Sequence, residues 1–83
     1  MKKSRWPFVD VTWEDAVSDS CWLTLDQLPE LRVIQSRGWM IIKDKKRVTI
    51  ASSMNGLTKG LEAVSEVTSI PRGCIVSIKK LGA

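Results

Sequence analysis

Residues 32–52 read RVIQSRGWMIIKDKKRVTIAS, and this segment predicts a β-hairpin. Its first part, residues 32–44, is rich in β-branched and aromatic side chains and is longer than a typical strand. Because glycine inside a strand commonly marks a bulge, Gly38 predicts the bend that curls a small sheet toward a barrel. Asp44-Lys45-Lys46 then predicts a polar turn, and residues 47–52 alternate as the returning strand.

Three further strands flank this hairpin in the sequence. Residues 8–12 predict a first strand, with Pro7 at its start, where a missing backbone N–H costs least. Residues 66–70 and 74–78 predict two strands joined by a proline- and glycine-containing turn at 71–73. Five short strands separated by turn signals predict a mostly β fold. We expect a small, strongly bent five-stranded antiparallel barrel of the SH3-like or Sm-like kind.

One or two short helical turns are expected between these strands. Thr12-Trp13-Glu14-Asp15 has the form of a helix start, and the pattern continues to Val17. Thr24-Leu25-Asp26-Gln27 repeats that form, with Gln27 placed to reach back to the cap before Pro29 limits the turn. Asn55-Gly56 predicts the end of the hairpin, and residues 57–65 are expected to form an irregular loop.

A chain of 83 residues is expected to form one domain with a thin stability margin, for which oligomerisation is a common remedy. We assign residues 6–81 to a single small β-barrel domain, residues 1–5 to a flexible basic tail and residues 82–83 to the C-terminal end. No apolar run approaches the roughly 20 residues of a membrane helix, and no signal peptide is expected. The sequence therefore predicts a cytoplasmic protein that does not bind membranes.

Charge is segregated along the chain. Residues 6–31 carry six acidic residues and no basic one, whereas residues 32–50 carry six basic residues and one acid. The net charge of +4 would otherwise suggest a nucleic-acid binder, but the acidic third repels phosphate unless it folds away. Complementary halves suit either self-association or a bipolar surface. The expected interface residues are Asp15, Asp19, Lys45, Lys46 and Arg47.

Catalysis and metal binding are the functions that the composition supports least. The chain has no His and no Tyr, so the usual general acids and bases are few. We expect Glu14 and Asp15 to cap a helix start rather than to act in catalysis. Cys21 and Cys74 belong to no Cys-x-x-Cys pair and are expected to be small, reduced core residues, with a disulfide as the less favoured alternative. No catalytic residue, metal site or cofactor is predicted.

Four tryptophans in so short a chain are candidates for binding. Trp13 and Trp39 each lie beside an apolar segment and are expected in or against the core. Trp22 lies in a loop, where an aromatic side chain either holds the loop down or stacks on a ligand. Arg37 and Arg72 each stand beside a glycine that permits close approach of an anion. The predicted ligand-binding residues are therefore Trp13, Trp22, Arg37, Trp39 and Arg72.

A set of short motifs spans most of the chain: Val11-x-Trp13-x-Asp15-Ala16, then Trp22, then Gly38-Trp39, then Ile70-Pro71-x-Gly73-x-Ile75. This pattern resembles one seen among small uncharacterised bacteriophage-encoded proteins. The resemblance implies an accessory factor that blocks a host system, either by binding a host protein or by sequestering a small nucleotide signal.

Three hypotheses about function follow. The first is a non-enzymatic homo-oligomer that sequesters an anionic nucleotide and so counters a host defence, with tryptophan stacking on the base and arginine holding phosphate. The second is a protein-interaction module that inhibits a host or phage protein through its acidic face or a sheet edge. The third is nucleic-acid binding by residues 43–47, which ranks lower because the basic residues lack interleaved aromatics.

Overall fold

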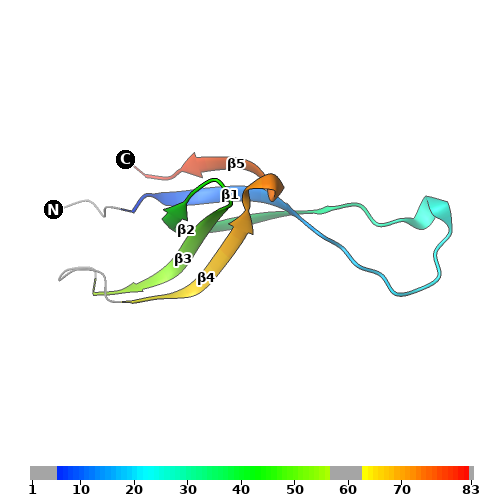
Figure 1. Cartoon of the computed structure of the whole chain (residues 1–83), viewed down its shortest axis with the longest axis horizontal. Helices are drawn as coiled ribbons and strands as arrows, with labels where there is room; N and C mark the ends of the chain where they lie inside the picture. Colours follow the sequence, from blue (N-terminus) through cyan, green and yellow to red (C-terminus); the bar gives the residue numbers. More distant parts are fainter. Residues whose placement is uncertain (1–5, 57–62, 83) are drawn as a thin grey trace.

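The computed structural model describes residues 6–56 and 63–82, which form an antiparallel sheet with the strand order β4-β3-β2-β1-β5 (Figure 1). Two short 3-10 turns, η1 and η2, are the helical segments of the described residues. The prediction of a mostly β, five-stranded antiparallel fold is confirmed. The strands are β1 (Phe8–Asp15), β2 (Arg32–Lys43), β3 (Arg47–Asn55), β4 (Ala63–Pro71) and β5 (Ile75–Lys80), with η1 at Leu25–Gln27 and η2 at Arg72–Cys74.

The sheet is bent but open. Strands β4 and β5 form its two edges, and they do not pair with each other within residues 6–56 and 63–82. Closure of a barrel would require such pairing, because only a closed sheet has no edges. The predicted barrel is therefore not confirmed: the sheet is curved and open.

The hairpin predicted from residues 32–52 is confirmed. The Asp44 carboxylate Oδ1 accepts hydrogen bonds from the backbone N–H groups of Lys46 and Arg47, at 2.8 and 2.9 Å. The backbone N–H of Asp44 donates to the carbonyl of Arg47 at 3.0 Å and closes the turn. Strand β3 continues to Asn55, beyond the predicted end at residue 52.

Gly38 has a role that differs in detail from the expected bend. It is buried, and a Cβ atom there would lie 2.7 Å from the carbonyl oxygen of Ala51 on β3. The irregularity in the β2–β3 ladder lies a few residues later, where the register shifts between Met40 and Ile42. Gly38 therefore allows two backbones to approach closely, and the bulge follows it.

The predicted helix start at residues 12–17 is wrong, because β1 continues through Asp15. Trp13 stands opposite Ile34 on β2 and Ile75 on β5, and Glu14 stands opposite Val33. Pairing on both sides of β1 overrides a local capping signal. The second predicted turn is confirmed as η1: the backbone N–H of Thr24 donates to Gln27 Oε1 at 3.1 Å.

The loop predicted at residues 57–65 is partly wrong. Residues 63–65 belong to β4, since Ser53 pairs with Ser65, Met54 with Val64 and Asn55 with Ala63. The sequence does not predict these ends of β3 and β4, because residues 53–55 and 63–65 contain few of the usual strand-forming residues. Residues 57–62, the predicted tail at 1–5 and Ala83 at the C-terminal end lie outside the described residues.

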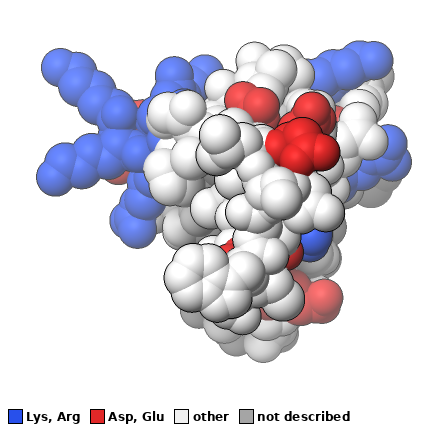
Figure 2. Space-filling view, turned by 90° about the vertical axis from the view of Figure 1, so that its right-hand side faces the viewer, with Lys and Arg blue, Asp and Glu red and all other residues white. Residues whose placement is uncertain are grey.

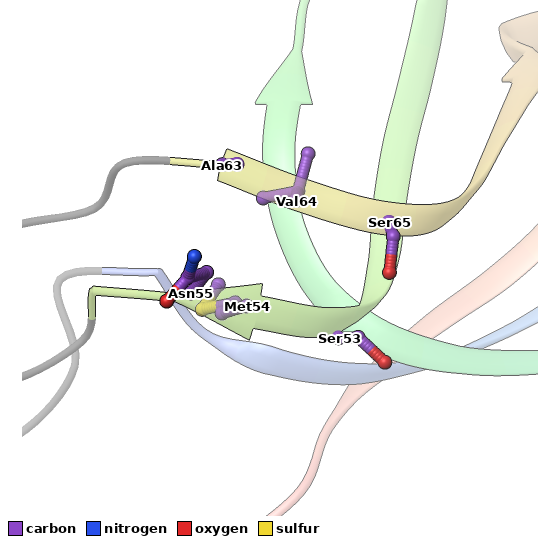
Figure 3. Close-up of a pocket in the computed structure, with 6 residues that line it drawn as sticks. All are labelled: Ser53, Met54, Asn55, Ala63, Val64 and Ser65. Carbon is purple, nitrogen blue, oxygen red and sulfur yellow. The ribbon is translucent and has the colours of Figure 1, made fainter.

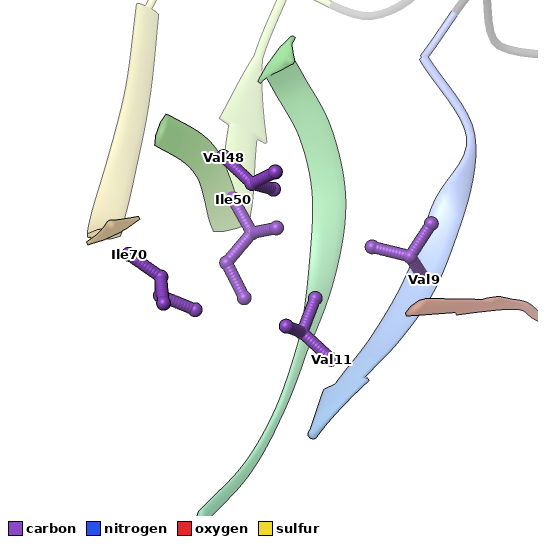
Figure 4. Close-up of a cluster of buried hydrophobic side chains, with 5 residues drawn as sticks. All are labelled: Val9, Val11, Val48, Ile50 and Ile70. Atoms are coloured by element: carbon purple, nitrogen blue, oxygen red, sulfur yellow. The ribbon is translucent and has the colours of Figure 1, made fainter. Parts of the chain in front are cut away.

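The core is small. It consists of five side chains that point into the concave side of the sheet: Val9, Val11, Val48, Ile50 and Ile70 (Figure 4). Trp13 and Cys74 pack against this cluster, as predicted for both. Cys21 is free and exposed, so the prediction that it is a core residue is wrong: it lies in the long connection between β1 and β2, away from the sheet.

That connection, residues 16–31, projects from the sheet and is called the arm below (Figure 1, cyan). The molecule measures 57 × 23 × 21 Å, and its radius of gyration is 16.4 Å. A compact chain of this length has a radius of gyration of about 12 Å. The arm therefore makes the protein far more extended than a small globular domain.

Candidate functional site

The arm is held in shape by hydrogen bonds between near neighbours in the chain. Asp15 Oδ1 accepts from the backbone N–H of Ala16 at 2.9 Å, and Asp19 Oδ1 accepts from that of Cys21 at 2.8 Å. In η1, the N–H of Gln27 donates to the carbonyl of Thr24 at 2.9 Å. Asp15 and Asp19, two of the predicted interface residues, thus also fix the backbone at and beyond the point where the arm leaves β1.

Large apolar side chains of the arm face solvent. Trp22 is 103% exposed, Leu25 is 87% exposed, and Leu28 and Leu31 are each 60% exposed. Val33, at the start of β2, is 63% exposed and continues the same series. Among the described residues, the two other exposed large apolar side chains are Val67 and Val76. Large exposed apolar patches are typical of protein–protein or membrane interaction sites and of ligand-binding grooves.

The charges of the arm are all negative. Asp19, Asp26 and Glu30 lie on it, and it contains no basic residue. The Thr24 hydroxyl donates to the Asp26 carboxylate, which lowers the pKa of Asp26 and keeps it charged. Figure 2, which looks at the molecule from the side of the arm, shows acidic and uncharged side chains facing the viewer and basic ones at the margins.

A basic cluster lies on the sheet, made of Lys45, Lys46, Arg47 and Arg72. The backbone N–H of Arg72 donates to the carbonyl of Lys46 at 3.0 Å, which ties η2 to the hairpin turn. Arg47 stands opposite Pro71 in the β3–β4 ladder. Hydrogen bonds from the N–H groups of Arg47 and Lys46, with the nearby charges of Arg47 and Arg72, lower the pKa of Asp44. The structure thus places Arg72 with the predicted interface cations.

Three other predicted ligand residues have partners within the sheet. Arg37 Nε lies 3.4 Å from Asp10 Oδ2, its neighbour on β1. The Trp39 ring contacts Phe8 edge to face, with centroids 5.1 Å apart. The Trp13 indole N–H donates to Ser36 Oγ at 3.1 Å. These contacts give all three side chains a structural role in joining β1 to β2.

A shallow hollow of about 150 Å³ lies between the C-terminal end of β3 and the N-terminal end of β4 (Figure 3). Sites for drug-sized ligands usually enclose about 300–1,000 Å³. None of the predicted ligand residues lines this hollow. Its lining residues are Ser53, Met54, Asn55, Ala63, Val64 and Ser65.

The structure therefore separates the predicted ligand residues. Trp22 lies on the arm, Arg72 lies in the basic cluster, and Trp13 and Trp39 lie within the sheet. Sequence reasoning missed Leu25, Leu28 and Leu31, because leucines near a short helical turn usually pack inward. Their exposure could have been predicted from one signal: residues 16–31, between two strands, contain acidic and apolar residues and no basic residue.

In the part of the chain that the structure describes, no group of three or more His, Cys, Asp or Glu side chains could hold a metal ion. Neither helical segment of residues 6–56 and 63–82 has the length and apolar character of a membrane-spanning helix.

The chain was compared with protein-family models, with curated proteins and with solved structures, and none of them matches it.

Proposed function

We propose that this chain is a non-enzymatic protein-binding module and that the arm, residues 16–31, is its binding surface. The observation that carries the proposal is the exposure of Trp22, Leu25, Leu28 and Leu31 on one projecting segment. Tryptophan is enriched among the residues that dominate binding energy at protein interfaces. An acidic segment with such anchors fits a partner surface that is apolar at its centre and basic around it.

Local hydrogen bonds within the arm fix part of its conformation before a partner binds. The carboxylates of Asp15 and Asp19 accept hydrogen bonds from backbone N–H groups of the arm. At η1, the backbone N–H of Thr24 donates to the side chain of Gln27. Binding then orders few additional dihedral angles, and this lowers the entropic cost of association.

The arrangement of charged groups supports binding over turnover. The pKa values of the Asp26 and Asp44 carboxylates are both lowered. A lowered pKa keeps a carboxylate charged near neutral pH, whereas a general acid or base works best with a pKa near the operating pH. The sequence also contains no His and no Tyr.

The nucleotide-sequestering role stays a prediction. It requires a stacking tryptophan and a phosphate-binding arginine at one place, yet Trp22 and Arg72 lie on different parts of a single copy and Arg37 is paired with Asp10. A screen of cyclic and linear nucleotides for thermal stabilisation tests it, since only a ligand of the native state raises the melting temperature.

We further infer that the sheet is of the SH3-like kind. The strand order β4-β3-β2-β1-β5, the long connection between β1 and β2, and the 3-10 turn between β4 and β5 support this inference. The resemblance to phage-encoded accessory proteins supports a role that works by binding. A cytoplasmic location and a counter-defence role remain part of the same proposal.

The test is a capture experiment with matched variants. Tagged protein is produced in bacterial cells that also make an untagged copy, and captured proteins are quantified by mass spectrometry. The arm variant carries Trp22→Ser and Leu25→Ser, and the control carries Val67→Ser and Val76→Ser, which are exposed apolar residues outside the arm. We expect the control variant to retain at least one captured protein that the arm variant loses. Equal capture by both variants contradicts the proposal.

A further inference from the structure

We propose that the surface bound by the arm is the basic cluster of a second copy of this chain, so that two copies exchange arms reciprocally. This inference rests on the proposed function, because it names the partner of the same surface. The basic cluster is Lys45, Lys46, Arg47 and Arg72, as defined above.

Charge complementarity is the first argument for a second copy as the partner. The arm holds three of the nine acidic residues of the chain and none of its thirteen basic ones, so the remainder of the chain has a formal charge of +7. The arm, with a formal charge of −3, is therefore complementary in charge to the remainder of a second copy. Opposite potentials of this kind steer two surfaces together and fix their register.

The arm does not meet this cluster within its own copy. It leaves the sheet after Asp15 and returns at Arg32, and Figure 1 shows its tip standing clear of the strands. The hairpin turn at residues 44–46 and η2 lie on the sheet itself, where the N–H of Arg72 bonds to Lys46. A second copy supplies the contact that the extended shape of one copy prevents.

The exposed apolar side chains of the arm and of the start of β2 are the second argument. One copy has a core cluster of five side chains, while five large apolar side chains between Trp22 and Val33 stay exposed. Specific interfaces bury about 1,600 Å² in total, and two tryptophans alone supply about 300–500 Å² of that area. Reciprocal exchange covers these residues in both copies at once. The exchange is closed by two-fold symmetry, so it stops at a dimer.

The exchange also explains why Trp22 and Arg72 are found apart. In the dimer, Trp22 of one copy approaches the cations of the other, and an indole face attracts an Arg or Lys side chain. The sequence predicts a tryptophan and an arginine in one binding site. In the proposed dimer they meet across the interface, and each comes from a different copy.

The test uses two charge variants that repel themselves and attract each other. The positive-arm variant carries Asp19→Lys, Asp26→Lys and Glu30→Lys. The negative-cluster variant carries Lys45→Glu, Lys46→Glu and Arg72→Glu, and it keeps Arg47 beside Asp44. A control variant carries Lys79→Glu and Lys80→Glu on β5, which changes the net charge outside the cluster. Circular dichroism melting curves verify that each variant is folded.

Mass is measured by sedimentation equilibrium at about 100 µM, where even micromolar dimers are populated. We expect the wild type and the control to be dimers, each charge variant alone to be a monomer, and their equimolar mixture to be a heterodimer. A monomeric wild type, or a mixture that stays monomeric, overturns the proposal.

The failure of this inference is distinguishable from failure of the proposed function. If the wild type is monomeric but the arm variant still loses a captured protein of another kind, the partner named here is wrong and the arm remains a binding surface. If neither mass nor capture depends on the arm, both proposals fall.

Discussion

Trp13 on β1 and Ser36 on β2 are joined by a hydrogen bond of 3.1 Å from the indole N–H to the hydroxyl oxygen. The bond lies two residues before β1 ends and the arm begins. Trp13 also packs against the buried cluster of valines and isoleucines. One side chain thus connects the small core to the strand pair from which the arm projects.

Ser36→Ala removes the acceptor of this bond and leaves the half-buried indole N–H of Trp13 without it. We expect the free energy of unfolding to fall by about 1 kcal/mol, the usual net contribution of such a bond. Ser52→Ala is the control, because Ser52 Oγ makes an exposed bond of 3.2 Å to the Arg37 carbonyl and its loss should cost under about 0.5 kcal/mol. Urea denaturation measures both, and equal losses contradict the structural role of Trp13.

Gly38→Ala tests the close approach of β2 and β3. The added Cβ would lie 2.7 Å from the carbonyl oxygen of Ala51, so one backbone must move. We expect a loss of about 1–3 kcal/mol in the free energy of unfolding, as for overpacked sites. Gly73→Ala is the matched control, since a Cβ there would have no atom within 4 Å beyond Gly73 and its two neighbours in the chain. Similar melting temperatures for the two variants would falsify the packing described at Gly38.

The hairpin could be predicted from sequence because its signals are local. The polar turn at Asp44 and the alternating strand after it agree with each other, and the structure keeps both. The helix predicted from Thr12 failed for the opposite reason. There the local capping pattern competes with pairing to β2 and β5, and partners distant in sequence decide the conformation.

The stability contributed by Asp44 should depend on pH. Its pKa in the folded protein is lowered from 3.8 by the N–H groups of Arg47 and Lys46. The contribution is therefore fully present above the unfolded pKa near 3.8 and is lost as the pH falls through the lower folded value. We expect Asp44→Asn to be less stable than wild type at neutral pH, with a gap that closes under acid.

Thermal melts of both proteins at several pH values down to about pH 2 measure this gap. A gap that stays constant over the acidic range contradicts the assignment, because an uncharged cause such as altered packing does not titrate.

Substitutions in the arm should separate binding from folding. Trp22 and Leu25 make little contact with the sheet, so Trp22→Ser and Leu25→Ser should change the free energy of unfolding of a single copy by under about 0.5 kcal/mol. Ile70→Ala empties part of the core and should cost about 2–5 kcal/mol. Urea denaturation, carried out at a concentration where each protein is monomeric, compares them. A large loss for the arm variants contradicts their exposure.

The candidate site could be predicted only in part. Segregated charge along the chain suits either self-association or a bipolar surface, and the structure places the acidic residues on the arm and the hairpin cations beside η2. The exposure of Leu25, Leu28 and Leu31 could not be predicted, because the same residues in a longer connection with helical spacing would cover a core. Arg72 joins the hairpin cations through a backbone bond to Lys46, a contact between residues far apart in sequence.

A photo-crosslinking amino acid, p-benzoyl-phenylalanine, placed at position 22 in cells that produce the protein, measures directly whether the arm is covered. Its matched control carries the same group at position 76, where Val76 is 60% exposed on β5. We predict a discrete adduct with one protein from position 22, and the mass of a second copy of this chain identifies the partner proposed above. No adduct from position 22 beyond that from position 76 would show that the arm holds nothing.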